Sequence, residues 1–155
     1  MAFSDHFAPV AADYDRHRPG YPPGLFAFLA EAAPATERAW DCATGTGQAA
    51  RGLAEHFAAV RATDASAGQV EQATGPANVH YSVAPAEASG LDDASVDLVT
   101  VAQALHWFDL PAFYAEVRRV LRPGGVLAVW SYNLLEVDPE VDAVIARLYR
   151  DRLGP

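Results

Sequence analysis

Two closely spaced glycines follow a short apolar stretch in the segment Trp40-Asp41-Cys42-Ala43-Thr44-Gly45-Thr46-Gly47-Gln48. Glycine lets a chain turn tightly from a strand into a helix and approach a ligand with no Cβ in the way. Such a turn also leaves the first amides of the following helix free to face that ligand. The segment therefore predicts an open α/β fold that binds a nucleotide-like ligand at the turn.

Strand-like apolar segments alternate with helical patterns along the chain, which is typical of parallel strands joined by crossover helices. The predicted strands cover residues 39–43, 60–63, 79–83, 96–102 and 126–130. Helices are predicted over 24–33, over 48–57, from Ser66 with Gln69 at capping-box spacing, after Asp109 as far as Pro123-Gly124-Gly125, and from Pro139.

The length of 155 residues fits one domain, 1–155, with a helical cover over 1–34 and the cofactor-binding sheet over 35–155. The cover is either plain packing or a lid over the ligand. Because the longest apolar runs are too short to span a bilayer and the chain opens without a signal-like segment, we expect a cytoplasmic protein that does not enter membranes.

Charge and residue usage exclude several classes of function. A net charge of −9 repels a phosphate backbone, so we expect no nucleic-acid partner. The chain has no lysine, which excludes a Schiff-base enzyme and a Walker A loop. One cysteine and no H-x-x-x-H pair predict no metal site.

Two acidic residues narrow the choice of ligand, because the run from Gly45 to Ala50 also fits the G-x-G-x-x-G/A pattern of dinucleotide-binding domains. Asp64, at the end of the second predicted strand, can accept hydrogen bonds from ribose hydroxyls, or it can merely cap the next helix. Asp41 precedes the turn, where it would repel a pyrophosphate but attract the ammonium and sulfonium groups of S-adenosylmethionine, directly or through water. The alternative is that Asp41 only complements a helix N-terminus.

An ordered set of segments resembles the class I S-adenosylmethionine-dependent methyltransferases, in particular the type 11 branch of the trans-aconitate methyltransferase kind. Residues 41–48 resemble motif I of that family, and Asp64 falls at its ribose-binding position. Pro85-Ala86-Glu87 with Ser89-Gly90-Leu91 resembles the segment that receives the adenine. Similar segments also cover residues 14–22, 96–108 and 119–127.

The resemblance implies a Rossmann-like open parallel sheet in the order 3-2-1-4-5, with helices on both faces and S-adenosylmethionine as the cofactor. It implies cofactor-binding roles for Asp41, Ala43, Gly45, Gly47, Asp64, Ala65, Ala86, Glu87 and Gln103, and substrate-binding roles for Tyr14, Arg18 and Trp107. Ala43 stands where the commoner family pattern has glycine. A methyl group is tolerable there if the residue keeps ordinary backbone angles.

Methyl transfer from a sulfonium centre depends mainly on holding the acceptor behind the methyl group, so a general base is optional. His106, just past the fourth predicted strand, is the candidate catalytic residue: it either accepts a proton or only shapes the pocket. The expected acceptor is a small molecule, with carboxylates among the candidates. A nicotinamide-dependent oxidoreductase and a non-catalytic cofactor- or partner-binding module are the alternatives.

The family's usual final two strands are missing after the last predicted helix. Residues 126–130 are therefore expected to form an exposed sheet edge, and such edges recruit partners. We expect either a truncated version of a longer protein or a chain that self-associates through this edge, for example as a homodimer. The alternative is that the last helix folds back over the edge.

Overall fold

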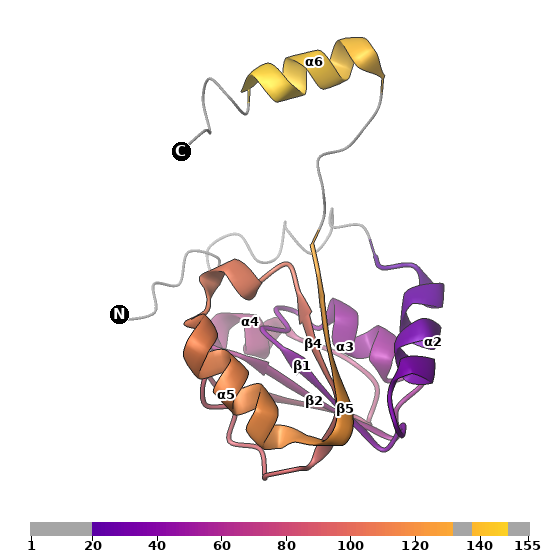
Figure 1. Ribbon diagram of the computed structural model, residues 1–155, viewed down its shortest axis with the longest axis vertical. Coiled ribbons are helices and arrows are strands. Elements are labelled where there is room, and N and C mark those ends of the chain that lie inside the picture. The colour runs from indigo at the N-terminus through magenta and orange to yellow at the C-terminus, as the bar shows by residue number, and fades with distance from the viewer. Residues whose placement is uncertain (1–19, 132–137, 149–155) are drawn as a thin grey trace.

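The computed structural model describes residues 20–131 and 138–148 of the chain. The core of the described part is a five-stranded parallel sheet in the order β3-β2-β1-β4-β5, which confirms the predicted 3-2-1-4-5 arrangement. Helices lie on both faces of the sheet (Figure 1). The strands are β1 (Arg38–Cys42), β2 (Ala59–Asp64), β3 (Val79–Val83), β4 (Val96–Ala102) and β5 (Leu121–Trp130).

The helices begin close to where the sequence predicts them. The side chains of Ser66 and Asp109 accept hydrogen bonds from the amides of Gln69 and Ala112, and so cap the two helices that follow. The described helices are α2 (Pro23–Ala32), α3 (Gln48–Leu53), α4 (Ala67–Gln72), α5 (Leu110–Val120) and α6 (Pro139–Leu148), with a 3-10 turn, η2 (Leu105–Trp107).

The predicted ends of two helices were wrong. Helix α3 ends at Leu53 rather than at residue 57, because the chain closes there into a tight turn in which the His56 amide donates to the Leu53 carbonyl. Helix α5 ends at Val120, before the Pro-Gly-Gly stop signal, because Leu121 is already extended. Residues 122–125 bulge out of β5, and regular pairing with β4 starts at Val126, the predicted start of this strand.

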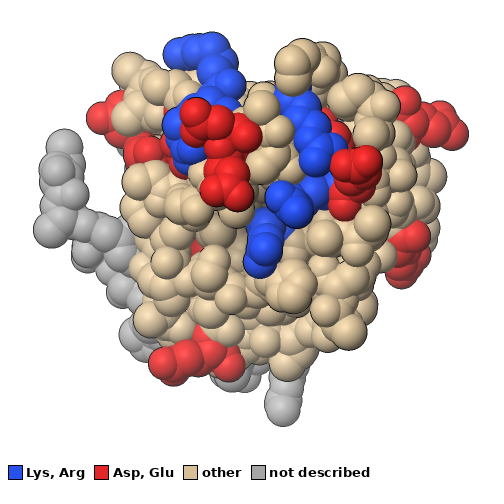
Figure 2. All heavy atoms as spheres, turned by 90° about the horizontal axis from the view of Figure 1, so that it is seen from below, with Lys and Arg blue, Asp and Glu red and all other residues tan. Residues whose placement is uncertain are grey.

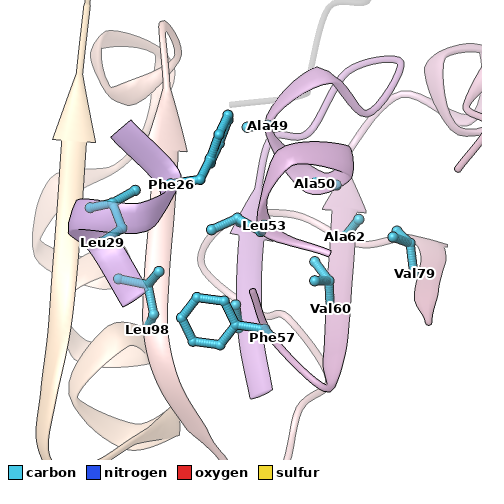
Figure 3. Packing of buried hydrophobic residues seen from close by; sticks show 11 residues of the cluster. Phe26, Leu29, Ala49, Ala50, Leu53, Phe57, Val60, Ala62, Val79 and Leu98 are labelled. Atoms are coloured by element: carbon cyan, nitrogen blue, oxygen red, sulfur yellow. The ribbon is translucent and has the colours of Figure 1, made fainter. Parts of the chain in front are cut away.

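The hydrophobic core lies on both faces of the sheet. On one face, residues of α2 and α3 pack against the central strands (Figure 3). Phe113, Val117 and Val120 of α5 pack with Trp40 on the other face. Because both faces of β1 and β4 are covered, these strands are buried along almost their whole length instead of at alternate residues.

A glycine inside α3 allows a close approach between α2 and α3 on the first face. A Cβ at Gly52 would lie 2.2 Å from the Phe26 ring, so only glycine leaves room for this ring. Phe26 is 5 % exposed and is one of the buried residues through which α2 packs on the sheet (Figure 3). The contact fixes α2 beside α3, the helix that follows the glycine turn.

Charged side chains fasten the end of the sheet at which the strands begin. The buried Asp97 carboxylate at the start of β4 accepts hydrogen bonds from the Glu37 and Arg38 amides at 3.0 and 2.9 Å. It also pairs with the Arg122 guanidinium at 2.9 Å. Figure 2, seen from below, shows basic and acidic side chains close together on this face. The network ties β1, β4 and the bulge of β5 together.

Strand β5 forms one edge of the sheet, as expected, and Val129 is 42 % exposed. Helix α6 lies apart from the sheet in Figure 1, with Val141 40 % and Val144 68 % exposed, so it does not cover this edge. Self-association through the edge stays a prediction. None of the helices in the described part of the chain is long and apolar enough to cross a bilayer.

Candidate functional site

The predicted site residues of the described part lie at or beyond the carboxyl ends of β1, β2, β3 and β4. The chain leaves β1 toward β2 on one side, whereas β4 lies on the other side of β1. Connections that diverge from neighbouring strands leave a crevice beyond their carboxyl ends, which is the usual ligand site of open α/β sheets. The glycine turn after β1 opens onto this crevice.

The glycine turn requires its glycines. Gly45 and Gly47 have φ angles of 58° and 93°, a left-handed region that side chains rarely adopt, and Gly47 is the N-cap of α3. A Cβ on Gly47 would also lie 2.2 Å from the Tyr81 hydroxyl. The turn is therefore closed from the side of β3, while its other side faces the crevice.

Ala43 adopts a strained backbone conformation. Its φ is 55°, so the condition of ordinary backbone angles, under which a methyl group is tolerable here, is not met. The turn places a left-handed residue here, so the methyl group of Ala43 carries strain that glycine would avoid. Gln103, at the end of β4, has a φ of 63°. The two residues flank the crevice, where such strain is typical of functional sites.

Asp41 is buried at the end of β1 and is only 1 % exposed. Its two oxygens accept hydrogen bonds from the Thr44 and Thr100 hydroxyls at 2.6 and 2.8 Å. Burial raises its pKa from 3.8 to about 6, since the hydrogen bonds from Thr44, Thr100 and the Ala50 amide only partly offset the loss of water. A cation arriving beside this carboxylate would regain the electrostatic stabilisation that burial removes.

The hollow next to Asp41 measures about 10 Å³, which is on the scale of one water molecule. A water there can bridge Asp41 to a ligand's ammonium group. The hollow is lined by Tyr21, Asp41, Ala43, Thr44, Gln48, Ala49 and Ala102. Tyr21 precedes α2, and its ring meets the Trp130 ring edge-on at a centroid distance of 5.4 Å.

Asp64 ends β2 and connects the glycine turn to α4. One carboxylate oxygen accepts from the Gly45 amide at 2.8 Å, and the other accepts from the Ser66 amide at 2.9 Å. Ser66, not Asp64, caps α4, so capping that helix is not the reason for an acid at this position. A carboxylate accepts several hydrogen bonds at once and is a suitable acceptor for the two hydroxyls of a ribose.

The predicted adenine side lies after β3. Ala86 is 8 % exposed and packs with the cluster around Phe113, and the next residue, Glu87, accepts a hydrogen bond from the Asp109 amide at 2.9 Å. Ala65 follows Asp64 at the end of β2. All three residues thus lie beyond the carboxyl ends of β2 and β3.

The predicted acceptor side is η2, directly after β4. His106 and Trp107 are exposed there, with their ring centroids 4.7 Å apart, and Trp107 is 62 % exposed. Both residues thus lie at the surface beyond the end of β4. Tyr14 and Arg18, the other predicted acceptor contacts, lie outside the described residues.

Sequence reasoning missed the threonines that hold Asp41. Thr100 lies directly across from Asp41 in the pairing of β1 with β4, although 59 residues separate the two in the chain. The sequence signal was the lone hydroxyl within the apolar run of β4, which becomes informative only once the register is known. Among the described residues, no group of three or more His, Cys, Asp or Glu side chains is arranged to hold a metal ion.

Residues 40–129, which contain the glycine turn, Asp41, Asp64 and η2, match a family described as a methyltransferase domain. This chain belongs to that family. A Dictyostelium discoideum protein that carries the name of a methyltransferase is 40% identical over 98% of this chain and 59% of its own length. An uncharacterised methyltransferase of Mycobacterium tuberculosis is 41% identical over 81% of the chain and 51% of its own length.

The fold of solved methyltransferases agrees with this assignment. The structure of a type II methyltransferase from Anaeromyxobacter dehalogenans is similar with a TM-score of 0.79 and 56% sequence identity, and the match covers 86% of this chain and 57% of that one. The chain thus spans between half and three fifths of the length of these relatives. Its similarity to the trans-aconitate branch stays a prediction.

Proposed function

We propose that this chain binds S-adenosylmethionine and transfers its methyl group to a small-molecule acceptor. The proposal rests on one observation above all: Asp41 and Asp64 stand on either side of the glycine turn, at the ends of adjacent strands. Two carboxylates match a ligand with a cationic amino acid at one end and a ribose at the other. A pyrophosphate placed at the same turn would meet both negative charges.

Each side of the crevice would bind one part of the cofactor. Asp64 would accept hydrogen bonds from the ribose hydroxyls while it holds the Gly45 amide. Asp41 would attract the ammonium group through water, and its ionised form would be favoured once the cation is bound. The residues after β3, Ala86 and Glu87, would border the adenine. The bound cofactor would supply an electrophilic methyl group.

The acceptor would enter from the side of η2. His106 and Trp107 present polar and aromatic surfaces next to the end of β4, which suits a small, partly apolar molecule with a polar group. For an ionised acceptor such as a carboxylate, positioning is enough; for a hydroxyl or an acidic carbon, His106 would accept the proton. Carboxylate methylation remains the favoured form of the proposal because it requires no base.

Calorimetry tests the cofactor directly. We expect S-adenosylhomocysteine to bind and NADH not to bind, whereas binding of NADH alone would favour a nicotinamide-dependent oxidoreductase. Asp64→Ala should weaken S-adenosylhomocysteine binding by about ten- to a hundredfold, because a charged acceptor facing two hydroxyl donors is lost. Glu71→Ala, which removes an exposed acid from α4, is the matched control and should leave the affinity unchanged.

If Asp64→Ala folds and binds S-adenosylhomocysteine as tightly as the wild type, Asp64 is not part of the ribose site. Activity is then measured as methyl transfer from labelled S-adenosylmethionine to a panel of small carboxylic acids. Cofactor binding without transfer to any compound class in a broader panel would instead favour the non-catalytic module.

A further inference from the structure

The connection from β3 to β4 is fastened to α5 by two carboxylates that the sequence did not link to each other. Glu87 Oε1 accepts from the Asp109 amide at 2.9 Å, where α5 begins. Two residues further along the connection, the Ser89 amide and hydroxyl donate to Glu116 Oε1 at 2.8 and 2.5 Å, in the middle of α5. The predicted adenine segment therefore runs along α5 and is held at two points.

Apolar packing supports the same contact. Ala86, immediately before Glu87, is buried in the cluster that contains Phe113 of α5. Leu105 of η2 and Phe108, which follows η2, pack against this cluster. The adenine segment and the acceptor-side turn thus share one packed surface, and Glu87 forms the polar contact at its rim.

The contact of Glu87 completes a helix cap that α5 cannot complete alone. In a capping box, the third residue of a helix is Glu or Gln, and its side chain accepts from the amide of the N-cap residue. The N-cap of α5 is Asp109, and its third residue is Ala112, which has no acceptor in its side chain. Glu87 supplies the missing carboxylate from a segment 22 residues away.

From this geometry we infer that Glu87 is a positioning residue that couples the cofactor segment to the acceptor-side turn. When a bound cofactor holds residues 85–91 in place, the Glu87 carboxylate keeps the amide of Asp109 in place as well, and η2 with His106 and Trp107 is held with it. The inference rests on the proposed cofactor site. It assigns Glu87 to transmitting cofactor binding rather than to contacting the adenine through its side chain.

Hydrogen–deuterium exchange measured by mass spectrometry tests the coupling, with peptides that cover residues 84–92 and 104–112. In the ligand-free protein, Glu87→Ala should speed exchange in 104–112 by roughly three- to tenfold, the factor expected from the loss of one hydrogen bond. With S-adenosylhomocysteine bound, the wild type should be protected in both peptides. Glu87→Ala should keep protection in 84–92 and lose most of it in 104–112.

Two further variants control the experiment. Asp92→Ala removes an exposed acid from the same connection and should behave as the wild type. Glu87→Gln keeps an acceptor of similar size and should restore most of the protection, even if the alanine variant is poorly folded. Equal exchange of 104–112 in Glu87→Ala and the wild type, with and without ligand, would overturn the coupling.

Failure of the cofactor site gives a different result. If S-adenosylhomocysteine neither binds nor protects the wild type, the proposed function is wrong, while the ligand-free comparison still reports on the contact between Glu87 and Asp109. A Glu87→Ala variant that loses S-adenosylhomocysteine affinity as severely as Asp64→Ala would place Glu87 at the adenine and overturn its positioning role.

Discussion

Asp41 at the end of β1 and Glu116 in the middle of α5 are both buried carboxylates, 1 % and 7 % exposed. Their pKa values move in opposite directions: that of Asp41 rises to about 6, and that of Glu116 falls to about 2. Glu116 receives two hydrogen bonds from the Arg119 guanidinium as well as those from Ser89. Asp41 receives bonds from neutral groups, and no arginine of the described residues forms an ion pair with it.

The difference separates a structural carboxylate from a binding one. Glu116 has its counter-charge within the fold, so its contribution is complete before any ligand arrives. Asp41 is desolvated without a counter-charge, which costs stability whenever it is ionised. Such a cost is tolerated where a cationic ligand can offset it, as the ammonium group of the proposed cofactor would.

The sharpest way to break this comparison is Asp41→Asn, with unfolding free energies measured in urea between pH 4 and 7.5. The folded protein holds the Asp41 proton more tightly than the unfolded chain does. The contribution of this proton to the free energy of unfolding is therefore fully present below pH 3.8 and is lost as the pH rises through about 6. The two pKa values correspond to roughly 3 kcal/mol. Above pH 6 the asparagine variant should be more stable than the wild type by up to that amount.

The same substitution should harm binding. The asparagine side chain carries no charge to attract an ammonium group, so S-adenosylhomocysteine affinity should fall by at least as much as in Asp64→Ala. A gain in stability together with a loss of affinity is typical of binding groups that are strained in the free protein. If the difference in unfolding free energy between the wild type and Asp41→Asn stays constant from pH 4 to 7.5, the pKa of Asp41 is not raised.

Glu116→Gln tests the other half of the comparison. The amide keeps the shape and can still accept from Ser89, but it loses its charge toward Arg119, so we expect a loss of about 2 kcal/mol at pH 7. The contribution of Glu116 is present above pH 4.5 and is lost as the pH falls toward 2, so the two proteins should converge in acid. Glu31→Gln, an exposed acid on α2, is the control. If the difference in unfolding free energy between the wild type and Glu116→Gln does not narrow below pH 4, the ion pair of Glu116 with Arg119 does not contribute as proposed.

Much of the fold and part of the site could be predicted because their signals are local in the chain. The glycine turn follows a recognisable strand, Asp41 and Asp64 lie near the ends of two such strands, and parallel strands bring their carboxyl ends to one edge. The bond from Thr100 to Asp41 depends on strand register, and the bond from Ser89 to Glu116 spans 27 residues. The left-handed conformation of Ala43 was missed because alanine gives no sign of it.

The smallest expected effect is that of Ala43→Gly. This substitution tests whether backbone strain at Ala43 lowers the stability of the site in addition to the buried charge of Asp41. A left-handed alanine costs roughly 1–2 kcal/mol, and the greater freedom of glycine in the unfolded chain offsets about half of it. We expect a gain in stability below about 1 kcal/mol. Ala94→Gly, at a φ of 47° outside the site, is the matched control.

The two glycine variants should differ in binding. Ala43→Gly should change S-adenosylhomocysteine affinity because it alters the backbone beside Asp41, whereas Ala94→Gly should change stability alone. Equal affinities for the wild type and both variants would mean that the strain at Ala43 has no part in binding.

Cys42 follows Asp41 in β1, is 1 % exposed and is the single thiol of the sequence. Burial, and after it the negative charges of Asp41, Glu87 and Asp64, raise the pKa of this thiol. The intact protein should therefore resist alkylating reagents, because a buried neutral thiol is a poor nucleophile. Because a reagent reaches Cys42 only when the centre of the sheet opens, the rate of Cys42 modification reports the frequency of that opening. A bound cofactor should slow this rate in proportion to its occupancy.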